Sequence, residues 1–235
     1  MLPVDAPQGP GLAVVTGANR GLGLGVLRRL AERGHPVVLG ARDVEKGREA
    51  AEGLGNVHVH ELDVTRQDSV DGLAAWVREH HGGLEILVNN AAVHYDTFQT
   101  AIGADLAIAE EALAVNTLGA WRTTVACQDL LRRGARVVNV SSGSGSFGET
   151  DGAGGTPAYA VSKAALDMLT VKLAADLRRR GVLVNAVCPG WVATDMGGPG
   201  GRPLDEGVDS ILWAVDLPPD GPTGTFTRDG RPIPW

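Results

Sequence analysis

Short apolar runs alternate with longer helical stretches along nearly the whole chain, and this alternation limits the possible folds more than any other feature. Strands are expected at residues 12–16, 36–40, 57–61, 84–89, 135–141 and 182–187. Helices are expected at residues 21–33, 44–54, 67–80, 105–132 and 158–180. Most strand runs are apolar on both faces, as is typical of buried parallel strands. The pattern predicts a single α/β domain over residues 1–235, with a doubly wound parallel sheet of about seven strands and helices on both faces.

Composition excludes several classes of protein. The net charge is −7, and no run of basic residues is longer than the three arginines at 178–180, so nucleic acid is not an expected partner. No segment approaches the roughly 18 consecutive apolar residues of a membrane span, and the start lacks a basic leader, so we expect a cytoplasmic protein without membrane contact. Cys127 and Cys188 form no CxxC pattern. His58 and His60 lack further ligands at metal spacing, so no metal site is predicted.

The residues that follow each expected strand are the candidates for function, because the carboxyl ends of parallel strands face the ligand crevice of such a sheet. The first strand leads into Thr16-Gly17-Ala18-Asn19-Arg20-Gly21-Leu22-Gly23 and then a helix. Glycines here let backbone amides approach a pyrophosphate at the helix N-terminus. A glycine-rich turn alone is a weak signal, since tight turns use glycine anyway. Its place between a first strand and a helix favours nucleotide binding.

Arg42 follows the second strand, at the position where an NAD-binding fold usually carries an acidic residue for the ribose hydroxyl. Arginine suits a 2′-phosphate instead, and Arg20 supplies a second cation. Asp43 is the alternative ribose partner, but its place before a helix indicates an N-cap. The pattern favours NADP over NAD.

Tyr159 and Lys163 stand four residues apart in an expected helix, so their side chains share one face. An ammonium group near a phenol favours ionisation of the phenol and lowers its pKa from about 10. That would suit the tyrosine to proton transfer near neutral pH. Taken alone, an exposed polar pair is the commoner explanation.

Six motifs occur in one order along the chain: TGxxxGxG, NNA at 89–91, a helical asparagine at 116, VSS at 140–142, YxxxK at 159–163 and PG at 189–190. With these motifs the sequence resembles the short-chain dehydrogenase/reductase family over nearly its whole length. The stretches 137–142, 188–192 and 222–235 are most similar to the NADPH-dependent carbonyl reductases. The resemblance implies a Rossmann-like fold, NADP(H) as cofactor, and hydride transfer to a small-molecule carbonyl substrate.

The resemblance also implies roles for four catalytic residues. Ser142 matches the serine that hydrogen-bonds the substrate carbonyl, with Ser141 as the neighbouring alternative. Tyr159 matches the proton donor in reduction. Lys163 matches the residue that bonds the nicotinamide ribose and lowers the tyrosine pKa. Asn116 matches a helical asparagine whose backbone holds a water molecule in a proton relay.

Cofactor contacts follow from the same match. They are Gly17, Asn19, Arg20, Gly21, Leu22, Gly23, Arg42, Asp63, Val64, Asn90, Ala91, Tyr159, Lys163, Pro189, Gly190, Val192 and Thr194.

Ala92 departs from the family, where glycine is commoner. The glycine-filled interval between Ser142 and Tyr159 is a second departure. Residues 143–156 and 196–207 are expected to be mobile loops, the second one closing over a ligand.

The substrate is expected to meet Ser142 together with an aromatic and apolar set of loop residues: His94, Tyr95, Phe147, Trp191 and Met196. The set contains no obvious cation for a phosphate or carboxylate, so an uncharged ketone or aldehyde is expected. Ordinary loop packing is the alternative explanation for each of these residues.

Two other functions remain open at this point. An alcohol dehydrogenase working in the oxidative direction would use the same residues. A noncatalytic NADP-sensing protein would keep the fold, although the presence of Tyr159 and Lys163 argues against it.

The long helices at 105–132 and 158–180 carry apolar positions that permit homo-oligomerisation.

Overall fold

The chain builds one eight-stranded sheet between two layers of helices in the computed structural model, which describes residues 9–150 and 154–235. The strands in sheet order are β3 (Val57–Glu61), β2 (Val37–Ala41), β1 (Ala13–Thr16), β4 (Leu84–Asn89), β5 (Leu131–Val140), β6 (Leu183–Val187), β7 (Phe226–Arg228) and β8 (Arg231–Pro232). All neighbours pair in parallel except β7 and β8. The predicted doubly wound α/β fold is confirmed, with the short antiparallel β8 added at one edge.

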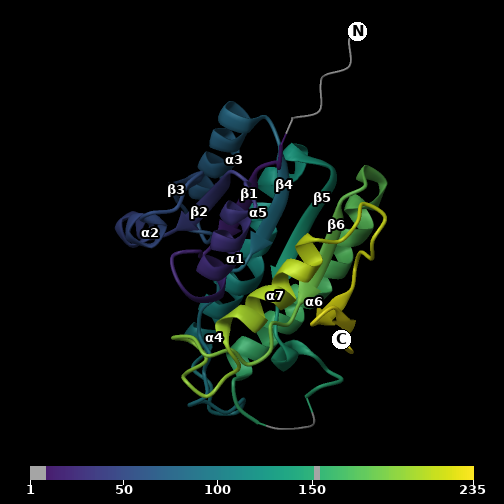
Figure 1. The fold of residues 1–235 in the computed structure, drawn as a ribbon. Coiled ribbons are helices and arrows are strands. Elements are labelled where there is room, and N and C mark those ends of the chain that lie inside the picture. The colour runs from purple at the N-terminus through teal and green to yellow at the C-terminus, as the bar shows by residue number, and fades with distance from the viewer. Residues whose placement is uncertain (1–8, 151–153) are drawn as a thin grey trace.

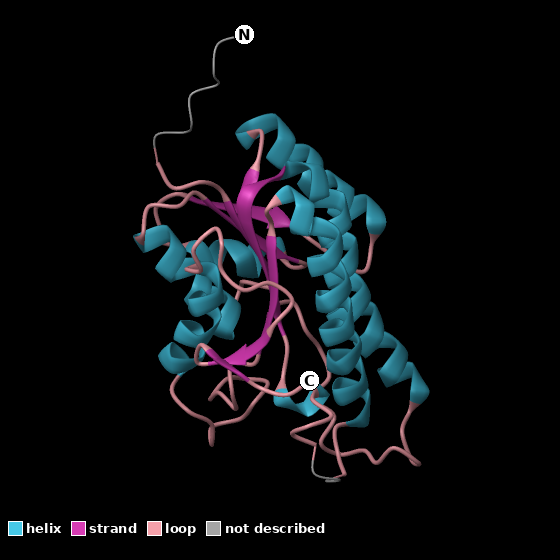
Figure 2. Cartoon of the chain, turned by 90° about the vertical axis from the view of Figure 1, so that its right-hand side faces the viewer, coloured by secondary structure: helices cyan, strands magenta, loops and turns pink. Residues whose placement is uncertain are grey.

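Helices cover both faces of the sheet (Figures 1 and 2). They are α1 (Gly21–Glu32), α2 (Val44–Ala51), α3 (Gln67–His81), α4 (Leu106–Ala112), α5 (Ala120–Cys127), α6 (Pro157–Leu177) and α7 (Leu204–Val215). Apolar residues of α1 and α7 pack on one face of the sheet, and those of α3, α5 and α6 pack on the other. No helix in the described part of the chain is both long enough and apolar enough to cross a membrane.

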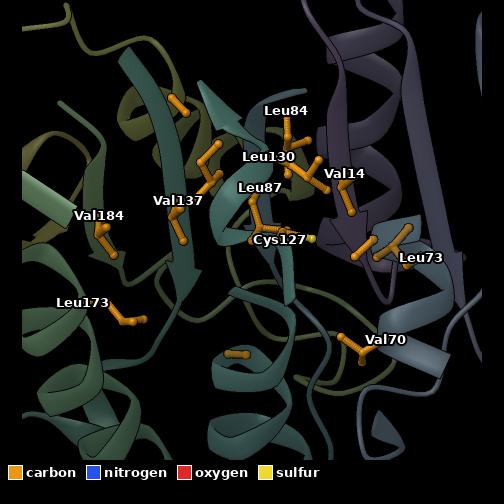
Figure 3. Packing of buried hydrophobic residues seen from close by; sticks show 14 of the residues in the cluster. Val14, Val70, Leu73, Leu84, Leu87, Cys127, Leu130, Val137, Leu173 and Val184 are labelled. Atoms are coloured by element: carbon orange, nitrogen blue, oxygen red, sulfur yellow. The ribbon is translucent and has the colours of Figure 1, made fainter. Parts of the chain in front are cut away.

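The core behind α3, α5 and α6 is a continuous layer of buried aliphatic side chains. Figure 3 shows part of it, with side chains from strands and helices meeting between the layers. Leu87 on β4 and Val137 on β5 are completely buried there, as is Cys127 at the end of α5. Burial raises the pKa of the Cys127 thiol to about 12, so this cysteine is an inert core residue.

Three predicted elements differ from the structure. The single helix expected at 105–132 is α4, a π-helical turn (Leu113–Gly119), α5 and a short 3-10 turn, and residues 131 and 132 already belong to β5. The loop expected at 196–207 ends early, because α7 starts at Leu204 with two acidic residues in its first turn. The loop expected at 143–156 begins with a 3-10 turn (Gly143–Gly145), and its residues 151–153 lie outside the described residues.

The edge of the sheet carries a stack of aromatic rings. His58 on β3 stacks on Trp76 of α3 with ring centroids 4.0 Å apart, and His80 stacks on the same indole at 4.6 Å. His60 and His81 approach Trp76 at 6.1 and 5.4 Å. In the described part of the chain no His, Cys, Asp and Glu side chains group as they would to hold a metal ion.

Acid should destabilise the protein through this stack. Desolvation lowers the pKa of His58, His60 and His81 below the value of an unfolded chain, with the charge of neighbouring histidines adding to the shift. The unfolded state therefore binds more protons near and below about pH 6.5, and stability present above that pH is lost as the pH falls. We expect the free energy of unfolding in urea to fall between pH 7.5 and pH 5.5, and to fall less in His58→Phe. Equal losses in both proteins would contradict this role.

Candidate active site

A cavity of about 650 Å³ opens at the carboxyl ends of the central strands. The strand order reverses between β1 and β4, and the residues that follow these two strands form part of the cavity wall. This is the place where a doubly wound sheet binds ligands.

Nearly all the predicted site residues line this one cavity. Those assigned to the cofactor do so throughout: Gly17, Asn19, Arg20, Gly21, Leu22, Gly23, Arg42, Asp63, Val64, Asn90, Ala91, Tyr159, Lys163, Pro189, Gly190, Val192 and Thr194. Of the residues assigned to the substrate, Tyr95, Ser142, Trp191 and Met196 also line it. Residues nearly 180 positions apart in sequence thus form a single wall.

Two residues assigned to the substrate are not in the lining. Phe147 is 86% exposed and lies outside the wall of the cavity. His94 adopts a left-handed backbone conformation, with φ of +57°, and its Nε2 lies 2.6 Å from the carboxylate of Glu111. The neighbouring Tyr95 reaches the cavity instead. The structure therefore leaves His94 and Phe147 out of the substrate wall.

The glycine turn packs so closely against the residues after β4 that side chains would not fit at two of its positions. A Cβ on Gly17 would lie 2.9 Å from Ala91 Cα, and one on Gly23 would lie 2.4 Å from Asn90 Nδ2. Asn90 Nδ2 donates hydrogen bonds to the carbonyls of Thr16 and Gly17, which ties the turn to the end of β4. The turn thus holds its backbone close to the cavity at the N-terminus of α1, where an anion is favoured.

Cations gather near the end of β2. Arg42 lines the cavity and forms no ion pair within the described residues. Arg20 lies 3.3 Å from Asp195 in an exposed pair. Lys46 also lines the cavity, in the first turn of α2, and its Nζ lies 3.3 Å from the carboxylate of Asp43; sequence reasoning missed it. Asp43 accepts a hydrogen bond from the Lys46 backbone N–H at 3.1 Å, as predicted for an N-cap. These cations fit the 2′-phosphate that distinguishes NADP from NAD.

Tyr159 and Lys163 lie together on α6, nearly hidden from solvent. Lys163 Nζ lies 5.5 Å from the centre of the Tyr159 ring and donates a hydrogen bond to the Val140 carbonyl at 2.7 Å. The ring of Tyr95 meets that of Tyr159 edge-on, at 5.3 Å between centroids. The exposed pair that was the alternative explanation is therefore wrong, since Tyr159 is 9% exposed and Lys163 is 2% exposed.

The electrostatics of this pair differ from the sequence-based expectation. Burial raises the pKa of the Tyr159 phenol well above its ordinary value, and the Ser142 hydroxyl opposes only part of that rise. Burial also lowers the pKa of the Lys163 ammonium to about 8. Burial is the largest effect on both groups, so the phenol holds its proton more tightly and the ammonium loses its proton more readily.

Ser142 and Ser141 occupy different surroundings. Ser142 Oγ accepts a hydrogen bond from the Ser144 backbone N–H at 3.1 Å, on the Tyr159 side of the cavity. Ser141 is buried beside Asp167, one turn after Lys163 on α6. Burial raises the pKa of Asp167 to about 7, and the nearby Lys163 opposes this rise. Of the two serines, Ser142 is the one placed to meet a substrate together with Tyr159.

Asn116 lies behind the cavity and not in its wall. Its side chain is almost fully buried in the π-helical turn, where Nδ2 donates to the Val93 carbonyl at 3.1 Å and to Ser162 Oγ at 2.9 Å. Its Oδ1 accepts from the Val93 backbone N–H at 2.8 Å. The side chain therefore joins the segment after β4 to α6, which leaves only its backbone for the predicted relay.

Asp96 is a positioning residue that sequence reasoning did not find. The residue before α6, Thr156, has a left-handed backbone and makes no side-chain cap. Fully buried Asp96 supplies the cap from the β4–α4 segment: its two oxygens accept from the backbone N–H groups of Ala158 and Tyr159, both at 3.0 Å. No local pattern signals a cap supplied from more than 60 residues away.

Removing the Asp96 cap should affect turnover as well as stability. Asp96→Ala leaves two buried N–H groups unpaired and frees the first turn of α6, so we expect kcat to fall between about ten- and a hundredfold while the NADPH Kd stays similar. Asp105→Ala is the matched control, since Asp105 caps α4 at the other end of the same segment through the Ala107 N–H. It should cost about 1 kcal/mol of stability without lowering kcat. Equal loss of kcat in both variants would reduce Asp96 to a structural cap.

Comparison with known proteins agrees with this geometry. Residues 11–202 match the family described as short chain dehydrogenase. Carbonyl reductase (NADPH) 1 of Mus musculus is 34% identical over 278 residues, covering 95% of this chain and 98% of that protein. The structure of NADPH-bound carbonyl reductase from chicken fatty liver has a TM-score of 0.86 and 30% identity, covering 97% of this chain and 99% of that one.

A bacterial structure gives a similar match at lower identity. A short chain dehydrogenase from Burkholderia cenocepacia, solved in complex with NADP, has a TM-score of 0.80 and 28% identity, covering 94% of this chain and 96% of that one. The sequence, the fold and the arrangement of the cavity lead to one conclusion: the chain belongs to the short chain dehydrogenase family.

Proposed function

We propose that the protein is an NADPH-dependent reductase that converts an uncharged ketone or aldehyde to an alcohol, with Tyr159 as the proton donor. The observation that carries the proposal is that Ser142, Tyr159 and Lys163 line the same cavity as the glycine turn and Arg42. The relatives named as NADPH carbonyl reductases, matched over 95% of this chain, support the same reaction class.

NADP(H) is the cofactor that these residues fit. The glycine turn would hold the pyrophosphate, and Arg42, with Arg20 and Lys46, would hold the 2′-phosphate. Asp63, kept in place by hydrogen bonds from Thr65, would face the adenine end. Once bound, the reduced cofactor supplies a hydride to the carbonyl carbon.

Side chains of the protein itself would carry out the proton transfer. Ser142 donates a hydrogen bond to the carbonyl oxygen, and Tyr159 gives that oxygen its proton as negative charge develops there. The buried Lys163 ammonium stabilises the tyrosinate that remains. Asn116 keeps its proposed place in a relay through its backbone.

Reduction is the proposed direction because Arg42 and Arg20 favour NADPH over NAD, and because relatives named as NADPH carbonyl reductases match nearly the whole chain. An oxidative alcohol dehydrogenase would use the same residues, with Tyr159 as the base. The presence of both Tyr159 and Lys163 argues against a noncatalytic NADP sensor.

Homo-oligomerisation stays a prediction. Exposed apolar side chains on α5 and α6 support it, among them Trp121, Val125, Val161 and Met168. Sedimentation velocity would decide it, and a monomer at micromolar concentration would contradict it.

The proposed reaction is tested by NADPH oxidation with a panel of aliphatic, aromatic and cyclic ketones. We expect turnover with NADPH and much weaker turnover with NADH. Tyr159→Phe removes the donated proton, so kcat should fall by about 10²- to 10⁴-fold while the NADPH Kd stays within a fewfold range.

The chain offers a matched comparison, because Tyr95 is its other tyrosine. Tyr95→Phe also loses a phenolic hydroxyl at the cavity wall, but it should change KM and retain most of kcat. Substantial turnover in Tyr159→Phe would remove that residue from its role. No turnover by the wild type across the panel, with tight NADPH binding, would favour the sensor.

A further inference from the structure

Arg228 is a cation at the substrate end of the cavity, where the sequence predicts none. It is the last residue of β7 and lines the cavity together with Ser142 and Cys188. Its Nε and Nη2 atoms donate to Cys188 Sγ at 3.4 and 3.2 Å, which holds the guanidinium at the end of β6. The set of loop residues expected around the substrate therefore lacked a cation that the structure places in the cavity wall.

The carboxylate of Glu149 forms an ion pair with this guanidinium. Its Oε1 and Oε2 accept hydrogen bonds from Arg228 Nη1 at 3.0 Å and Nη2 at 2.6 Å. Such a bidentate pair cancels both charges and uses the two donors that best fit a carboxylate. The hydrogen bonds with Glu149 raise the pKa of Arg228, with burial opposing them, so the arginine keeps its charge.

The pair lies against the backbone that follows the proposed catalytic serine. A Cβ on Gly143 would lie 2.7 Å from Arg228 Nη2 and 2.3 Å from Glu149 Oε2. Gly143 comes directly after Ser142, so a substrate whose carbonyl reaches Ser142 would have its next few atoms near the guanidinium. Only a residue without a side chain leaves room for the pair at this point.

Glu149 is held in place before any substrate arrives. Its backbone N–H donates to Ser146 Oγ at 3.0 Å, and this hydroxyl donates in turn to the Pro234 carbonyl at 2.7 Å. Ser146 is completely buried. The carboxylate is thus an anchored intramolecular ligand, and a substrate carboxylate would have to displace it while also meeting its negative charge.

We propose that Glu149 is a specificity-determining residue that masks Arg228, so that the enzyme accepts uncharged carbonyl compounds and rejects keto carboxylates. The proposal rests on the proposed function and gives a physical cause for its substrate class. It also implies that the capacity to bind a carboxylate is present in the cavity wall and is suppressed by a single side chain.

The test compares a keto carboxylic acid with its methyl ester, using a keto group one to three carbons from the carboxyl group. The wild type should reduce the ester well and the acid poorly. Glu149→Gln keeps the shape of the side chain and removes its charge, so the ratio of kcat/KM for acid over ester should rise about tenfold or more. Adding Arg228→Gln to that variant should abolish the gain.

Asp229→Asn is the matched control. Asp229 forms a similar bidentate pair with Arg202, at 2.8 and 2.9 Å, but Arg202, unlike Arg228, does not line the cavity. This variant should leave the ratio of acid to ester unchanged. A comparable rise in Asp229→Asn would show that the loss of any nearby negative charge is enough, and would overturn the proposal.

A binding measurement keeps the test independent of turnover. Calorimetric titration of benzoate into the NADPH complex should give a Kd about tenfold lower for Glu149→Gln than for the wild type. An unchanged Kd and an unchanged ratio, in a variant that melts within a few degrees of the wild type, would overturn the masking of Arg228. Ester reduction by the wild type would still support the proposed function in that case.

Discussion

The site depends on the parallel pairing of β4 with β5, which runs in continuous register from Ile86 to Asn89. Asn89 and Asn139 are partners in that register, and Asn89 Nδ2 donates to Asn139 Oδ1 at 2.8 Å inside the core. Asn139 Nδ2 then donates to Thr170 Oγ1 on α6 at 2.8 Å. The same helix carries Tyr159 and Lys163, so this chain of buried hydrogen bonds ties the reacting residues to the sheet.

The two ends of the cavity differ in charge. At the cofactor end Arg42 forms no ion pair among the described residues, and the glycine turn adds the dipole of α1. At the substrate end Arg228 is matched by Glu149. Tyr159 lies between these ends and is so far removed from water that its proton is retained. This arrangement favours an anionic cofactor and an uncharged substrate within one continuous cavity.

Sequence patterns predicted the elements and turns that depend on residues close together in the chain. Apolar runs located the central strands, and the glycine pattern located the turn after β1, where no side chain fits at Gly17. Asp96 and the Arg228 pair escaped prediction because their partners lie about 60 and 80 residues away. The raised pKa of Tyr159 was not predicted either, because the four-residue spacing shows its charged neighbour but not how deeply the phenol is buried.

In the proposed reaction, one cavity brings NADPH and a carbonyl carbon together for direct hydride transfer. The most direct measurement uses NADPH labelled with deuterium at the transferring C4 position, with an uncharged ketone and NMR analysis of the alcohol. Direct transfer within this cavity should place one deuterium on the carbinol carbon for each NADPH oxidised. An alcohol without the label on that carbon, or NADPH oxidised without alcohol formed, would contradict it.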